Sequence, residues 1–102
     1  MKIIKCLSEK IKEELNDAES YIDLAMKWEK EQPEAAKLFA DLSREEMGHM
    51  DRLHNLVTKL INQYRQTKGE PPASMLAVYE YLHEQQIENA MKVKVKQAMY
   101  EG

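Results

Sequence analysis

The sequence is poor in the residues that cross-link chains and interrupt helices. It contains one cysteine, Cys6, and only three glycines and three prolines among 102 residues. A single cysteine excludes a disulfide within the chain and a thiolate zinc site, and it suits a reducing compartment. We therefore expect a cytoplasmic protein built largely from helices.

Strong charge of one sign and long hydrophobic runs are also absent from the sequence. The 15 basic and 18 acidic residues leave a net charge of −3, which gives no electrostatic footprint for nucleic acid. No apolar run approaches the roughly 20 residues of a membrane span, and we expect neither a membrane partner nor a signal peptide. A chain of this length allows one domain, and it buries only about two-thirds of its unfolded surface, so a sizeable core needs a partner.

Proline and glycine divide the chain into three predicted helices. Pro33 stands alone in the first half, and Gly69-Glu70-Pro71-Pro72 interrupts the second. The residue before a proline resists helix, whereas proline itself tolerates the first turn. We therefore expect an all-α fold with helices over about 5–31, 33–67 and 73–100, in which the first two form an antiparallel hairpin.

The first two predicted helices each carry a stripe of residues with alternating spacings of four and three. The stripes are Leu7, Ile11, Glu14, Ala18, Tyr21, Ala25 and Trp28, and then Phe39, Leu42, Glu46, His49, Leu53, Leu56 and Leu60. Such a stripe is typical of the packing seam of a left-handed helical bundle. All members are apolar or aromatic except Glu14, Glu46 and His49. A carboxylate on a packing seam must be paired, neutralised or bound to a cation.

The three polar members of the stripes are predicted to meet. The first turn centres near residues 31 and 32, so residues of the hairpin lie level when their numbers add to about 63, as those of Glu14 and His49 do. Glu46 and His49 stand one turn apart on the same helix face. Carboxylate oxygens with one imidazole suit iron or manganese better than a structural zinc site. The alternative is a buried Glu–His network that only fixes the register of the bundle.

Glu14, followed by Tyr21 and then by Glu46-x-x-His49, resembles the half-site of the ferritin-like superfamily of di-iron carboxylate proteins, which includes ferritins, bacterioferritins and rubrerythrins. A complete ferritin-like site takes a Glu from each of two helices and a Glu-x-x-His from each of two others. One chain supplies half of that set. The sequence is therefore most similar to the short encapsulated-ferritin or rubrerythrin-like type, whose subunits build the centre across an interface. This implies a homodimer, or a multiple of dimers, with a four-helix bundle around the metals.

The resemblance implies a ferroxidase that binds two iron ions through Glu14, Glu46 and His49 and oxidises Fe(II) with dioxygen or peroxide. The same ligands also accept manganese or zinc. Tyr21 is then either a redox-active or supporting residue beside the metals, or a simply packed tyrosine. Two alternatives stay open. One is a rubrerythrin-like peroxide reductase, which needs an external electron donor because Cys6 has no partner cysteine, and the other is a non-catalytic interaction bundle.

A second Glu-x-x-His, formed by Glu80 and His83, leaves a rival arrangement open. These residues would be additional ligands if the third helix crossed to a partner subunit. Within one chain they should lie level with residues 57–60, about 16 Å along the bundle from Glu46, so we expect a polar helix edge instead. Asp51 and His54 lie mostly outside the stripe, and we expect them to form a solvated pair.

Overall fold

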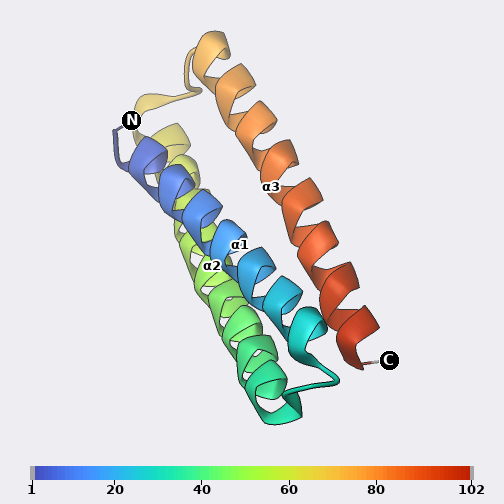
Figure 1. Ribbon diagram of the computed structural model, residues 1–102. Helices are drawn as coiled ribbons and strands as arrows, with labels where there is room; N and C mark the ends of the chain where they lie inside the picture. Colours follow the sequence, from blue (N-terminus) through green and yellow to red (C-terminus); the bar gives the residue numbers. More distant parts are fainter. Residues whose placement is uncertain (1, 102) are drawn as a thin grey trace.

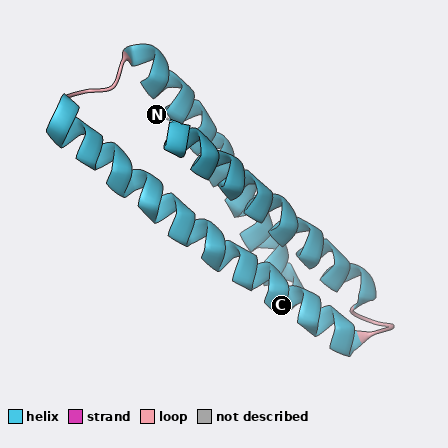
Figure 2. Ribbon diagram, turned by 90° about the vertical axis from the view of Figure 1, so that its left-hand side faces the viewer, coloured by secondary structure: helices cyan, strands magenta, loops and turns pink. Residues whose placement is uncertain are grey.

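Three long helices make up the described part of the chain, residues 2–101 of the computed structural model. They are α1 (Lys2–Trp28), α2 (Pro33–Lys68) and α3 (Ala73–Glu101), and the structure describes no strand in these residues (Figure 1). The bundle measures 56 × 19 × 18 Å, and its two loops lie at opposite ends of the long axis (Figure 2). The all-α fold predicted from the sequence is confirmed.

The helix ends follow from proline and glycine chemistry. Pro33 opens α2, where its missing N–H is no loss, and the amide of Ala36 donates to the carbonyl of Gln32 at 2.9 Å. At the other end, Gly69 adopts a φ of 83°, a conformation that favours glycine, and its amide donates to the carbonyl of Arg65 at 3.1 Å.

The first helix differs from its predicted range because it begins and ends three residues earlier, at Lys2 and Trp28. The amide of Gln32 donates to the carbonyl of Trp28 at 2.8 Å, so the chain turns over residues 29–32 before Pro33. The predicted helix extended to residue 31 and so left too few residues for the turn before Pro33. The bounds of α2 and α3 lie within one residue of the predicted ranges.

The buried face of α2 is not the predicted stripe. Its buried members are Ala36, Ala40, Ser43, Met47 and Met50. They pack against the buried members of α1, which are Ile4, Leu7, Ile11, Leu15, Ala18, Ile22 and Ala25. Small residues on this side let α1 and α2 approach closely, and Val93 of α3 packs onto the same core. The predicted stripe of α2 lies beside this core and stays partly exposed.

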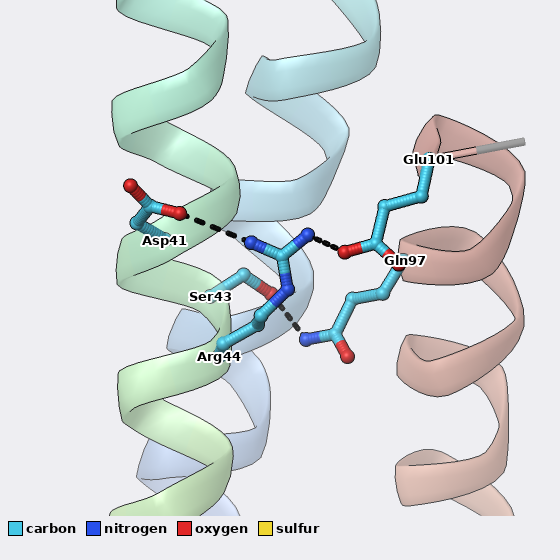
Figure 3. Close-up of polar contacts among 5 residues, drawn as sticks. All are labelled: Asp41, Ser43, Arg44, Gln97 and Glu101. Atoms are coloured by element: carbon cyan, nitrogen blue, oxygen red, sulfur yellow. Dashed lines mark hydrogen bonds and ion pairs between the residues drawn. The ribbon is translucent and has the colours of Figure 1, made fainter.

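Polar contacts fix α3 to the hairpin near its C-terminal end. The hydroxyl of Ser43 donates to the carbonyl of Ala18 at 2.7 Å and accepts from the Gln97 amide at 2.9 Å. Figure 3 shows Arg44 between Asp41 of its own helix and Glu101 of α3. These contacts, with Lys96 bonded to Asp23 at 2.8 Å, tie one end of α3 to both other helices.

Among residues 2–101, no helix is long and apolar enough to cross a membrane.

Candidate metal centre

The structure brings Glu14 of α1 together with Glu46 and His49 of α2. Each side chain offers one ligand atom, and these atoms all lie within 4.8 Å of one another. His49 Nδ1 lies 3.6 Å from Glu14 Oε2 and 3.8 Å from Glu46 Oε2. The antiparallel hairpin therefore sets these three residues at one level, as the stripes predicted.

The two carboxylates are sheltered, whereas the imidazole faces outwards. The side chains of Glu14 and Glu46 are 25% and 19% exposed, and that of His49 is 53% exposed. Glu14 Oε2 is buried and has no hydrogen-bond partner. A buried carboxylate oxygen without a donor is costly, and a bound cation removes that cost.

This donor set fits a metal ion. Two hard carboxylates and one imidazole match the preferences of Fe(II) and Mn(II). The atoms lie further apart than the ligands of one bound ion do, so binding of an ion would draw the three side chains together. Within residues 2–101, one chain brings three protein ligands together here, so the site is open on the side where His49 is exposed.

The cluster lies on the far side of the hairpin from α3. Asp23, which bonds Lys96 of α3, follows Glu14 by nine residues, which is half a turn around the helix. On α2, His49 follows Ser43 by six residues, which turns it about 120° away from the side that faces Gln97. Helix α3 therefore does not cover the cluster, whose imidazole stays exposed.

Apolar side chains surround the cluster on this side of the hairpin. We call them the open face: Tyr21, Phe39, Leu42, Leu53 and Leu56. All are half-buried or exposed, and Leu56 is 41% exposed. The rings of Tyr21 and Phe39 stack with centroids 6.4 Å apart. Tyr21 follows Glu14 by two turns, about 10 Å along the helix.

The second Glu-x-x-His motif does not join this cluster. The structure places His83 against His54 of α2, with the nitrogens His54 Nε2 and His83 Nδ1 3.2 Å apart. His54 is half-buried rather than solvated, which corrects the expectation for the Asp51–His54 pair. The sequence does carry a signal for the burial of His54. The buried residues of α2 follow one another at spacings of four and three, and His54 is the next position after Met50 in that series.

One comparison with known proteins identifies a family. A family model described as Rubrerythrin matches residues 5–101, nearly the whole chain. Neither the comparison with curated proteins nor that with solved structures gives a match. Rubrerythrins are ferritin-like proteins with a di-iron centre, so the match agrees with the carboxylates and histidine that the hairpin assembles.

Proposed function

The chain belongs to the rubrerythrin family, and on that premise we propose that it oxidises Fe(II) with dioxygen or peroxide at a di-iron centre shared between two copies of the chain. The single observation that carries the proposal is the open cluster of Glu14, Glu46 and His49. It has the ligand chemistry of the family's centre but only half of the ligands.

A second copy supplies the missing half. A ferritin-like di-metal site takes two Glu and two Glu-x-x-His motifs from four helices. Two hairpins related by a two-fold axis provide two copies each of Glu14, Glu46 and His49. In a two-fold interface each copy presents the same surface to the other, so one contact completes the ligand set and covers both open clusters.

The open face supports this arrangement energetically. Apolar groups such as Phe39, Leu42 and Leu53 border the cluster and remain partly accessible in the single chain. Burying such surface contributes roughly 25 cal/mol per Å². Pairing of two open faces thus enlarges the core of a small chain and excludes water from the ligands in the same step.

The two carboxylates and the imidazole have different roles in the proposed reaction. Iron is here the substrate: two Fe(II) lose one electron each, and dioxygen with two protons leaves as hydrogen peroxide, or hydrogen peroxide with two protons leaves as two waters. The anionic side chains of Glu14 and Glu46 favour the higher charge of the product, and each has a second oxygen that can follow a change in coordination. His49 supplies a neutral donor on an exposed ring that can adjust to the ion.

Substitution of His49 tests the assignment. His49→Ala should reduce the rate of oxygen consumption on Fe(II) addition at least 100-fold, because each ion loses its only nitrogen ligand, while the helical circular dichroism stays near that of the wild type. Asp51→Ala, on the same helix but outside the cluster, is the matched control and should keep the rate. Wild-type oxidation by His49→Ala would refute the site.

The family match also favours a second candidate, a peroxide reductase that uses the same ligands. Its distinguishing need is a supply of electrons, and the only cysteine of this chain is the exposed Cys6. The reductase would therefore depend on a separate electron donor, in the cytoplasm that we expect for this protein. Peroxide turnover that continues with a reductant present and no added Fe(II) would favour the reductase over the ferroxidase.

A further inference from the structure

A second group of metal-binding side chains lies between α2 and α3. His54 and His83 are 29 residues apart in the sequence, yet His54 Nε2 and His83 Nδ1 approach to 3.2 Å. Their rings stack with centroids 4.9 Å apart and planes inclined by 15°. This pair is notable because α2 and α3 otherwise contact each other little.

The pair is separate from the Glu14 cluster. His54 follows His49 by five residues, which places it about 7.5 Å further along α2 and about 140° around it. His54 continues the buried face of α2, the side that faces the other helices of its own chain, whereas His49 lies on the open face. The two imidazoles of α2 therefore cannot serve one ion.

Carboxylates accompany both imidazoles. Asp51 precedes His54 by one helical turn, and Glu80 precedes His83 by one turn on α3, so an acidic-x-x-His motif stands on each of two facing helices. Glu80 and both imidazoles line a cavity of about 290 Å³ between the helices. The cavity leaves room for an ion and its water molecules beside the ring nitrogens.

We propose that His54 and His83 bind a second metal ion, a Zn²⁺ or Cu²⁺ class cation, with water completing the shell. Glu80 lines the same cavity and would become the third ligand by rotating its side chain towards the ion. Two nitrogens at 2.0–2.1 Å from one tetrahedral ion lie about 3.3 Å apart, close to the 3.2 Å observed. By the Irving–Williams order of affinities, these nitrogen and oxygen ligands bind Cu²⁺, Ni²⁺ and Zn²⁺ more tightly than Fe(II) or Mn(II).

The protonation of the pair suits this role. Burial and the neighbouring His83 lower the pKa of His54, against a smaller opposing effect of Asp51. A neutral imidazole keeps a lone pair for a metal. In the metal-free protein one ring donates an N–H to the other, and the ion takes the place of that proton while the proton moves to the far nitrogen of the same ring.

The bound ion would hold α3 against α2 at the end of the bundle where α3 is least attached. The polar ties of Ser43, Arg44 and Lys96 all lie towards the C-terminal end of α3. A metal bridge from His54 to His83 adds a tie some 20 Å away along α3. It should therefore raise the melting temperature of the protein without any change at the Glu14 cluster.

The test uses Zn²⁺ and Cu²⁺ with the full chain in a His49→Ala background, which weakens binding at the first cluster. Calorimetric titration should show one Zn²⁺ per chain, and this binding should weaken at least tenfold in His83→Asn and severalfold in Glu80→Gln. Glu84→Gln, the exposed neighbour of His83, is the matched control and should bind as the parent does.

Electron paramagnetic resonance of bound Cu²⁺ gives a second readout that needs no substitution of His54, a half-buried residue of α2. The parent should show coupling to two imidazole nitrogens, and His83→Asn should show one. Equal Zn²⁺ affinity in the parent and His83→Asn, or coupling to a single imidazole in the parent, would overturn the proposal. Because His49 is absent throughout, either result is independent of the function proposed for the first cluster.

Discussion

At the scale of single residues, the side chains of the candidate metal centre destabilise the metal-free protein. Glu14 and Glu46 hold two carboxylates on sheltered positions beside one histidine, and Glu14 Oε2 has no hydrogen-bond donor. Two carboxylates held side by side repel each other, which costs free energy. Functional sites often retain such destabilising side chains, because a bound ligand offsets their cost in free energy.

That trade-off predicts the behaviour of Glu14→Gln. In the metal-free protein the amide removes a buried charge, so the free energy of unfolding should rise by roughly 0.5–1 kcal/mol, while iron binding weakens at least tenfold. Urea denaturation at fixed protein concentration measures the first effect. Glu13→Gln, at an exposed neighbour, should change stability by less than about 0.5 kcal/mol. A clear loss of stability in metal-free Glu14→Gln would show that the carboxylate is already compensated.

At the scale of the helices, the sequence was sufficient for some features and not for others. Pro33 and the Gly69–Pro72 segment define the breaks, and antiparallel geometry places Glu14 level with His49. The buried face of α2 was missed because large apolar residues of the predicted stripe outweighed the small ones, Ala36, Ala40 and Ser43, that permit close packing. Apolar periodicity alone supports both faces, and the close packing of α1 against the small residues of α2 decides between them.

The register of α3 could not be read from the sequence either. The loop between Lys68 and Ala73 does not fix how far α3 slides along α2. The level expected for Glu80 and His83 together was residues 57–60, whereas His83 contacts His54. Its outer residues add to the ambiguity, because a stripe of apolar side chains with spacings of four also lies on the exposed side of α3. Ile87, Met91, Val95 and Met99 are all exposed.

The hydroxyl of Ser43 is the centre of the contact among all three helices, and Ser43→Ala should show this. It removes a buried donor to the Ala18 carbonyl and leaves the Gln97 amide without its acceptor. We expect a loss of about 1–3 kcal/mol in the free energy of unfolding, measured by urea denaturation. Ser20→Ala, at an exposed position of α1, serves as the control, and equal stability of the two variants would contradict the packing described here.

The attachment of α3 to α1 should also depend on alkaline pH. The hydrogen bond to Asp23 raises the pKa of Lys96, although burial opposes it. The stabilising contribution is therefore complete below the ordinary lysine pKa of 10.5 and is lost as pH rises through the raised value. Lys96→Met should lower stability at pH 7 by at most about 1 kcal/mol, as for an exposed pair.

Melting curves at pH 7 and at about pH 11.5 test this effect, because the lysine titrates in that range. The gap in melting temperature between Lys96→Met and the wild type should narrow at the higher pH. A gap that stays constant would mean that the charge of Lys96 does not hold the helices together.

At the scale of the whole molecule, two surfaces of the elongated bundle expose apolar groups. The open face surrounds the half-site, and the outer side of α3 exposes Met91 and Val95 on the far side of the bundle. Pairing through the open face completes the ligand set but leaves the α3 surface accessible. Iron content and assembly mass are therefore informative only when they are measured together.

The most direct test of the shared centre is the iron retained per chain after anaerobic Fe(II) loading, measured together with the mass of the assembly in solution. The half-site account predicts about one iron per chain in a dimer or a multiple of dimers. Leu42→Lys, which places a charge on the open face, should give monomers that retain little iron, whereas Asn16→Lys, at an exposed position of α1, should assemble and load as the wild type does. A monomer that holds two irons per chain, or a dimer that retains none, would contradict the account.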